Sequence, residues 1–413
     1  MNGYKCGKEQ LTLKFSLQKY WSPVLLFAGA SLLMGLYAGF YDPSFNNYLA
    51  QVHQISEVAR GGLEFPRELP GFLTVFIFTL LIFLPDTRIA MLAAMMVCVS
   101  LLGQGFLAPN LTMVVVWMLL WSTGAHLFMV LKNSICLRLA SKGHAGRLLG
   151  RIGALEAFGT LLGMLFIYEI FTHLKPSFST IFLIAGCCAL AAGVLLALIK
   201  PVPLQRPEHN FVLKRRYSLY YLLNVLYGAR KQVFLTFAPW VLITLFHCNV
   251  ETFAMLGLIG TSLSLVFRPL LGVAIDRWGE RIVIFAESTM LVIICVLYGF
   301  SPLWFSAPTA LIIIMACYIA DQLLFAVHIS RATYLNRIAE CQSDVAPTLS
   351  MGQTIDHAVS MMVPMAGGLV WAHFGVQWVF AGAATIALLN LAAACFIPPL
   401  PQSRPAPAVE TVN

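Results

Sequence analysis

The sequence predicts an all-α membrane protein with twelve transmembrane helices in two six-helix bundles and with both termini in the cytoplasm. Of its 413 residues, 59% are hydrophobic and only 11% are charged, and the mean hydropathy is +0.81. This much apolar surface requires lipid, rather than water, around most of the chain. A bilayer core takes roughly 20 apolar residues per helix, so the length allows roughly twelve crossings.

Six apolar stretches form each half of the chain, and a polar, proline-containing linker separates the halves. The stretches lie near 22–50, 57–84, 88–107, 110–139, 147–172 and 177–199, and then begin near 218, 251, 281, 307, 346 and 376. We therefore expect a cytoplasmic tail at 1–19, a bundle at 20–199, a cytoplasmic linker at 200–217, a second bundle at 218–398 and a cytoplasmic tail at 399–413.

Basic residues set the expected orientation. They concentrate in the N-terminal tail, after the fourth stretch, in the linker and after the eighth stretch, whereas the opposite connections at 108–110 and 301–308 carry no charge. The positive-inside rule then places both termini in the cytoplasm. Because the net charge of +8 sits in these short segments, it does not indicate a nucleic-acid partner. We expect a multi-pass protein of the plasma membrane, such as a bacterial inner membrane.

The two halves also resemble each other in sequence. Residues 132–140 (KNSICLRLA) can be laid over 331–339 (RATYLNRIA) with basic residues at the same two places, and an acid follows in the next stretch. The alternative is coincidence between two helix ends, where basic residues are common. The matched residues are Lys132 with Arg331, Arg138 with Arg337, and Glu156 with Asp356.

One loop carries a recognisable family motif. The segment from Gly272 to Arg281, which reads G-x-x-x-D-R-x-G-x-R, resembles the loop between paired helices of the major facilitator superfamily. Its acid can accept hydrogen bonds from arginines and so latch one conformation. The equivalent place in the first half keeps an acid and a base but loses the glycines. The expected latch residues are Asp86, Arg88, Arg268, Gly272, Asp276, Arg277, Gly279 and Arg281.

Two further stretches are similar to this family, at 146–153 and 371–380. The resemblance implies two bundles that rock around a central cavity to expose it to either side in turn. It also implies a transporter without nucleotide hydrolysis, and the sequence has no phosphate-binding loop motif or metalloenzyme signature. We therefore expect no enzyme activity, no cofactor, no metal site and a monomer.

Ionisable residues within apolar stretches are the candidate pathway residues, because each costs about 2.5 to 3.5 kcal/mol at bilayer depth unless it is paired or hydrated. Glu64, Arg67 and Glu68 share one helix face if the second span begins near residue 56. The alternative is a polar external loop with a later helix start. Asp42 and Asn46 also share a face and offer a protonation site, unless Asp42 only caps or precedes the outer helix end.

The seventh stretch contains adjacent cations, Arg230 and Lys231. Arg230 is the preferred ligand for an anionic group because its planar fork binds carboxylates in a bidentate way. The alternative is a structural pair with Asp42 or Glu64. Further candidates lie in the fourth, fifth, tenth and eleventh stretches, either as pathway residues or as core pairs and side chains that reach the headgroups: His126, Lys132, Glu156, Asp321, His328, Arg331, Asp356 and His357.

These mixed charges favour secondary active transport, coupled to protons, of a small polar or anionic organic solute. An efflux pump for amphipathic compounds is the alternative within transport, and a membrane sensor or assembly partner is the alternative of another class. The expected partners are a small-molecule substrate, protons and membrane lipid.

Overall fold

The computed structural model describes residues 22–81, 83–140, 145–200 and 214–399, and these form helices and no strand. The two tails and most of the linker lie outside the described residues. The helices of the first half are α1 (Pro23–Gln51), α2 (Glu57–Gly62), α3 (Glu64–Phe72), α4 (Thr74–Leu80), α5 (Asp86–Phe106), α6 (Leu111–Leu139), α7 (Ala145–His173) and α8 (Phe178–Leu198).

The second half begins with a short 3-10 turn, η2, and contains a second one, η3, within the tenth expected stretch. Its elements are η2 (Arg215–Tyr217), α9 (Ser218–Thr244), α10 (Val250–Trp304), α11 (Ala307–Leu324), η3 (Phe325–Val327), α12 (His328–Ile338), α13 (Gln342–Phe374) and α14 (Val376–Ala394). The helices begin within a few residues of the expected stretches, except that the second stretch is broken into α2, α3 and α4.

Local sequence explains several of these boundaries. Ser22, Asn110 and Ser177 each accept a hydrogen bond from a backbone N–H of the first turn, which satisfies one of the donors left free at a helix start. Within α10 the helix is interrupted at Gly279, which has φ 83° and ψ 162°. Only glycine adopts this conformation readily, so the chain changes direction there and makes two helical segments, 250–278 and 280–304.

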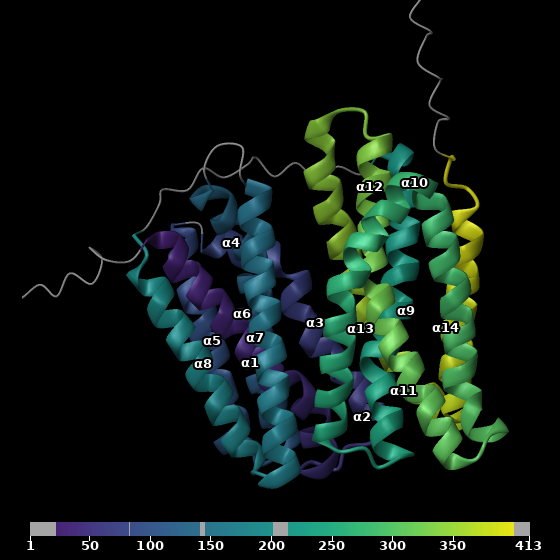
Figure 1. Ribbon diagram of the computed structural model, residues 1–413, viewed down its shortest axis with the longest axis horizontal. Coiled ribbons are helices and arrows are strands. Elements are labelled where there is room, and N and C mark those ends of the chain that lie inside the picture. The colour runs from purple at the N-terminus through teal and green to yellow at the C-terminus, as the bar shows by residue number, and fades with distance from the viewer. Residues whose placement is uncertain (1–21, 82, 141–144, 201–213, 400–413) are drawn as a thin grey trace, which may run out of the picture.

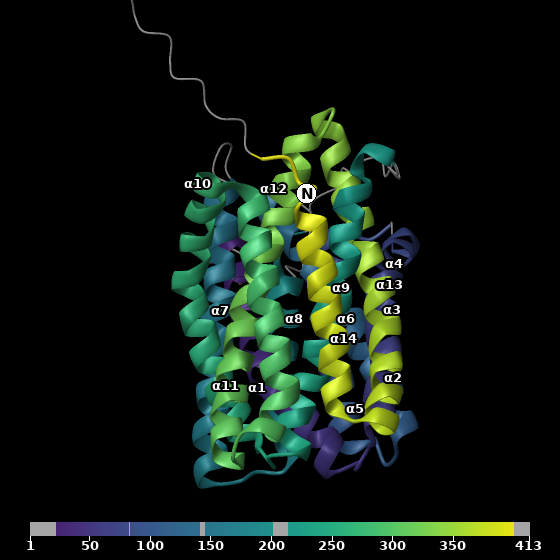
Figure 2. The ribbon, with the colours of Figure 1, turned by 90° about the vertical axis from the view of Figure 1, so that its right-hand side faces the viewer.

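The molecule consists of two groups of helices that lie side by side (Figure 1). In the first half, α1 contacts α7 and α8, and α5 contacts α6 and α8. In the second half, α9 contacts α13 and α14 (Figure 2), and α10 contacts α11 and α14. Separate clusters of buried apolar side chains support these groups, one mainly from the first half and three from the second.

Eight of the described helices are long and apolar enough to cross a membrane: α1, α5, α6, α7, α8, α10, α11 with α12, and α14. Large apolar side chains such as Phe76, Leu265 and Ile312 are exposed on them or beside them. An apolar outer surface is what lipid tails solvate. The remaining expected stretches are α2–α4, which is broken, and α9 and α13, which carry ionisable residues in their middle.

The two halves contact each other through a limited set of helices. α13 packs against α2 and α3, while α10 packs against α7 and α1. Residues 357, 364 and 368 of α13 contact α2 or α3, and they lie in the middle and later part of that helix. α2 lies near the lower end of the molecule in Figure 1, whereas α4 and α12 lie near the upper end.

Candidate functional site

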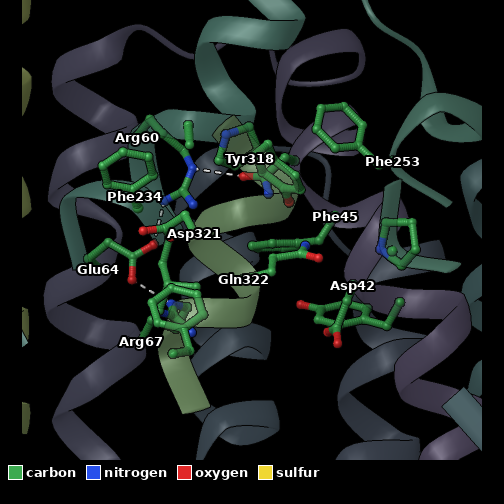
Figure 3. Close-up of a pocket in the computed structure, with 18 of the residues that line it drawn as sticks. Asp42, Phe45, Arg60, Glu64, Arg67, Phe234, Phe253, Tyr318, Asp321 and Gln322 are labelled. Atoms are coloured by element: carbon green, nitrogen blue, oxygen red, sulfur yellow. Dashed lines mark hydrogen bonds and ion pairs between the residues drawn. The ribbon is translucent and has the colours of Figure 1, made fainter. Parts of the chain in front are cut away.

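A cavity of about 420 Å³ lies between the two halves and is lined by side chains from both. α1 contributes Asp42 and Asn46, the segment of α2 and α3 contributes three charged residues, and α11 contributes Asp321 and Gln322 (Figure 3). Aromatic rings complete the wall. They are Tyr41, Phe45, Trp121, Phe234, Phe253, Tyr318 and Phe325.

Asp42 is exposed to this cavity and stands apart from the other charged groups (Figure 3). It lies inside α1, which continues to Gln51, so the interpretation as a cap or loop residue at the helix end is wrong. Among the described residues, no hydrogen bond or ion pair to Asp42 is found. A carboxylate without a partner in a cavity is free to bind a proton or a cationic group.

The second stretch places four charged side chains in one connected network. Arg60 Nη1 lies 2.5 Å from Glu64 Oε1, and Arg67 Nε lies 2.5 Å from Glu64 Oε2. Arg67 Nη2 lies 2.7 Å from Glu68 Oε1. Because Arg60, Glu64 and Glu68 are buried, the interpretation of this stretch as a polar external loop is wrong. Alternating signs let each buried charge be neutralised by a neighbour.

The network extends to both neighbouring elements. Arg60 Nε donates a hydrogen bond to Asn46 Oδ1 at 3.0 Å, and Gln232 Nε2 of α9 donates to Glu64 Oε2 at 2.6 Å. Glu64 is therefore held from both halves of the molecule. Arg60 and Gln232 were not among the predicted site residues. The i, i+4 spacing of Arg60 to Glu64 could have indicated the first, while nothing in the sequence pointed to the second.

Arg230 is buried within the second half. Its guanidinium forms an ion pair with Asp321, and it lies 5.6 Å and 5.3 Å from the ring centroids of Phe234 and Phe325. The alternative pairing of Arg230 with Asp42 or Glu64 is wrong, because the structure gives it Asp321 instead. Only 2% of Arg230 is exposed, and its partner Asp321, rather than Arg230 itself, lines the cavity.

Three further pairs neutralise the other candidates within each half. Lys231 Nζ lies 2.5 Å from Asp356 Oδ2, and Lys132 forms an ion pair with Glu156. Arg331 Nη2 lies 3.1 Å from Glu287 Oε2, and its guanidinium carbon lies 4.4 Å from the ring centroid of Tyr227. Glu287 was missed by the sequence analysis, although an acid within the apolar stretch that begins near 281 is itself a signal.

The internal resemblance has a structural counterpart. Arg138 Nη2 lies 3.0 Å from Asp86 Oδ2, and Arg337 Nη2 lies 3.1 Å from Glu280 Oε2. In both halves, a basic residue near the end of one helical stretch forms an ion pair with the acidic residue at the start of the preceding stretch. The two matched bases therefore make equivalent contacts.

The expected latch differs from the contacts found. Glu280, not Asp276, receives an arginine, and Arg88 donates to the carbonyl oxygen of Ala197 at 2.6 Å. Among the described residues, no ion pair is found for Asp276 or for Arg268, Arg277 and Arg281. Arg268, Gly272, Asp276 and Arg277 are exposed.

The histidines also separate in the structure. His357 Nδ1 contacts Glu68 Oε2 of α3 at 2.8 Å, so it does not pair with its sequence neighbour Asp356, which faces Lys231. His126 lies beside His357, with ring centroids 5.0 Å apart. His328 is exposed at the start of α12 and contacts the carbonyl oxygen of Phe325. His126 and His328 therefore make different contacts in the two halves.

Outside the helical bundles, the end of the linker is fixed by Lys214. Its Nζ lies 2.5 Å from Asp344 Oδ2 and 3.2 Å from Glu340 Oε2. These hydrogen bonds raise the pKa of Lys214, because they stabilise the charged ammonium.

Comparison with known proteins identifies the fold. The chain is similar to the nucleoside transporter NupG, with a TM-score of 0.72 and 12% identity over 91% of this chain and 98% of that one. It is also similar to a D-xylose-proton symporter (TM-score 0.65, 17% identity, covering 91% and 97%). A bacterial homologue of the human lysosomal transporter Spinster, in an inward-facing and unoccupied conformation, gives a TM-score of 0.66 at 12% identity, covering 90% and 95%.

No curated protein sequence matches the chain significantly. The profile of the Major Facilitator Superfamily, in contrast, matches residues 74–346, which is well over half of the chain. The match, the shared architecture and the apolar helices agree on a multi-pass membrane transport protein and not an enzyme. The chain belongs to the major facilitator superfamily.

Proposed function

We propose that the protein is a secondary active transporter that carries a small polar organic solute, coupled to protons, by alternating access. In this proposal twelve spans form two six-helix bundles at 20–199 and 218–398, and both termini and the linker lie in the cytoplasm. The observation that carries it is the cavity between the halves with an unpaired carboxylate, Asp42, in its wall. Its volume is within the range of small-molecule sites, about 300–1,000 Å³.

Asp42 is the proposed proton-exchanging group. A lone carboxylate in a cavity at bilayer depth is least costly when it is protonated or paired with a cation. Alternate exposure to the two sides would let it load a proton on one side and release it on the other. The fold that this chain shares with a D-xylose-proton symporter is compatible with such coupling.

The charges of the cavity favour a polar solute over a strongly anionic one. Arg60 and Arg67 already contact Glu64, and Arg230 is occupied by Asp321. The amide nitrogen of Asn46, the amide of Gln322 and the hydroxyl of Tyr318 lie in the wall, where they can form hydrogen bonds with neutral polar groups.

A second candidate is efflux of amphipathic cations, which the aromatic wall favours. Rings of Phe45, Trp121 and Phe253 lie in the same cavity as Asp42. An organic cation bound among aromatic faces gains cation–π attraction in addition to the carboxylate.

The contacts between the halves support a conformation in which the cavity opens toward the linker side of the molecule. The halves meet through α2 and α3 against the middle and later part of α13, and through α10 against α7 and α1. The loop residues Asp276 and Arg277 are exposed. In the proposed orientation, these contacts close the outer end of the cavity and leave its cytoplasmic end free to open.

Uptake into proteoliposomes with an imposed pH gradient tests the proposal. Neutral polar solutes, organic anions and aromatic cations are screened with the wild-type protein, Asp42→Asn and the control Glu169→Gln, an exposed acid of α7 far along the chain from Asp42. We expect gradient-driven uptake of a polar solute that Asp42→Asn abolishes and Glu169→Gln retains. Gradient-driven transport of aromatic cations alone would instead establish the second candidate. If Asp42→Asn transports with unchanged pH dependence, the proposed role of Asp42 is wrong.

A further inference from the structure

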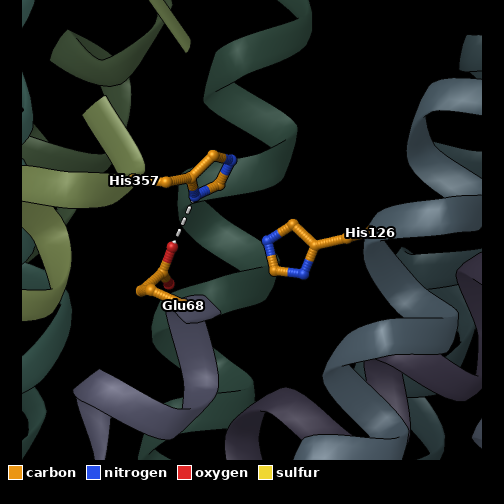
Figure 4. A group of neighbouring side chains, drawn as sticks. All are labelled: Glu68, His126 and His357. Carbon is orange, nitrogen blue, oxygen red and sulfur yellow. Dashed lines mark hydrogen bonds and ion pairs between the residues drawn. The ribbon is translucent and has the colours of Figure 1, made fainter. Parts of the chain in front are cut away.

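Glu68, His126 and His357 form a compact group outside the cavity wall (Figure 4). One ligand atom from each residue can be chosen so that all three lie within 4.8 Å of one another. The residues come from three helices, α3, α6 and α13, and therefore from both halves of the molecule. The sequence could not reveal this group because Glu68 and His357 are 289 positions apart.

The protonation pattern of His126 is fixed by its surroundings. The hydroxyl of Ser122 donates its only proton to the carbonyl oxygen of Arg67. His126 Nδ1, which lies 2.9 Å from the carbonyl oxygen of Ser122 and 3.0 Å from its hydroxyl oxygen, must then be the donor in those contacts. In the neutral ring, Nε2 is left with a free lone pair. Figure 4 shows this second ring nitrogen facing Glu68 and His357.

The glycine beside the group makes room for both rings. A Cβ atom at Gly71 would lie 2.6 Å from His126 Nε2 and 2.7 Å from His357 Cε1. Any larger residue would push one imidazole away from the other. The absence of a side chain at this point of α3 is therefore what allows the two histidines to meet.

The carboxylate of Glu68 is oriented so that one of its two oxygens can bind a cation. Arg67 Nη2 occupies Oε1 of Glu68 at 2.7 Å, while Oε2 faces His357 Nδ1 at 2.8 Å. The positive charge of Arg67 is in turn offset by Glu64. Glu68 can thus offer Oε2 to a cation without losing its hydrogen bond to Arg67.

We infer that Glu68, His126 and His357 form a binding site for a divalent transition-metal cation of the zinc class, which ties α13 to α3 and α6. Two imidazoles and one carboxylate, with a fourth position open to water, are a standard ligand set for such ions. The ion would bind His126 Nε2, His357 Nδ1 and Glu68 Oε2. The proton on His357 Nδ1 would pass by way of solvent to Nε2 of the same ring, so that the ligating ring stays a neutral imidazole. Since metal–nitrogen bonds are about 2.0–2.1 Å, small side-chain rotations must draw the three atoms closer together. The hydrogen bond from Nδ1 to Ser122 is the outer support that ligating histidines commonly have.

Metal titration of the purified full-length protein in detergent tests the site without any transport measurement. After treatment with a chelator, Zn²⁺ is titrated by calorimetry, and Co²⁺ is titrated by visible absorption. We expect one ion per chain, a rise in the thermal midpoint and Co²⁺ bands characteristic of a low-coordinate nitrogen and oxygen site.

Variants separate this site from adventitious binding. His126→Gln and His357→Asn should each abolish the stoichiometric binding. Ser122→Ala should weaken it by less than about tenfold, because it removes the hydroxyl but keeps the backbone carbonyl oxygen that also accepts from His126 Nδ1. His373→Asn, an exposed histidine on the same helix as His357, is the matched control and should bind as the wild type does. His126→Gln retains the His357–Glu68 contact, so it remains informative if His357→Asn does not fold.

Binding that is absent in the wild type, or that persists unchanged in His126→Gln, would overturn the inference. A separate measurement in proteoliposomes then shows what the ion does. Because it would hold the two halves together, Zn²⁺ should slow transport and a chelator should restore it. If no transport is found for any solute, the proposed function fails, while the titration still decides the metal site.

Discussion

Two charged regions of the molecule differ in how they relate to the two halves. The network of Arg60, Glu64, Arg67 and Glu68 is built on short, broken helices. All of it except Glu68 lines the cavity, and it reaches Gln232 and His357 of the second half. The pair of Arg230 and Asp321, in contrast, lies between α9 and α11 within the second half. Both regions are buried, yet only the first joins the two halves.

This difference separates two uses of a buried ion pair. A pair within one group of helices keeps its partners if the halves move as bodies, so it serves the stability of that half. A network shared by both halves must exchange some partners in such a movement, so it sets the relative free energies of the two states. We therefore expect mutations in the second region to affect folding and mutations in the first to affect transport.

The largest effect is expected from Arg230→Met. Removing the guanidinium leaves Asp321 buried without its partner, which destabilises proteins by about 3–5 kcal/mol. The thermal midpoint of the purified protein should fall sharply. The double variant Arg230→Met with Asp321→Leu should recover most of this loss, because it removes both charges. If Arg230→Met is as stable as the wild type, the pair is not structural and the comparison fails.

Glu64→Gln should affect transport more than stability. It removes the charge that holds Arg60, Arg67 and Gln232 together across the halves. Truncating one partner of a buried hydrogen-bonded charge pair costs about 2–5 kcal/mol, and about 1.4 kcal/mol corresponds to a tenfold change, so initial uptake should fall at least about tenfold. The thermal midpoint should fall less than in Arg230→Met, because Arg67 is partly exposed to the cavity and can be hydrated. An equal fall would make this network structural as well.

The repeated pairs allow a sharper comparison within each half. Arg138→Met and Arg337→Met break contacts of similar length to acids of similar burial. Each should destabilise the protein by about 1–2 kcal/mol, between the values for exposed and buried pairs. Equal shifts of the thermal midpoint would support a duplicated architecture with one equivalent pair in each half. A loss confined to one variant would show that the two contacts are not equivalent.

Lys214→Met should give the smallest effect, because its ion pairs lie at the exposed end of the linker. Its raised pKa means that the folded state binds the lysine proton more tightly than the unfolded state does. The stabilisation is therefore complete below the ordinary lysine pKa and is lost as the pH rises through the raised value. At neutral pH, the difference in thermal midpoint between wild type and Lys214→Met should shrink as salt is added, because salt screens exposed charges. A difference that is independent of salt would indicate a packing role for the side chain.

Much of the helix pattern was predictable from local sequence. Apolar stretches, the capping residues at Ser22, Asn110 and Ser177, and the glycine at the motif loop each act over a few positions. The second stretch was the exception. It was expected as one stretch from 57 to 84, and it forms three short helices, α2, α3 and α4, which meet near Leu63 and Leu73.

The choice of ion-pair partners was predictable only where the partners share a helical segment. Arg67 was placed correctly between Glu64 and Glu68 by their spacing. The partners of Arg230 and His357 could not be predicted in this way, since Asp321 is 91 positions from Arg230 and Glu68 is 289 positions from His357. A side chain in an apolar stretch must find a partner, but hydropathy does not say which one.

The sequence by itself determined that this chain is a bundle of membrane helices with ionisable groups inside it and a family motif in one loop. Hydropathy, capping and turn chemistry are local, so the order of residues suffices to specify them. The tertiary structure alone decided that Asp42 remains unpaired, that Arg230 is buried against Asp321 and that two histidines and a glutamate meet between the halves. Those outcomes depend on how helices far apart in the chain are packed, and the energy of a buried charge is set by the few groups that packing brings within reach.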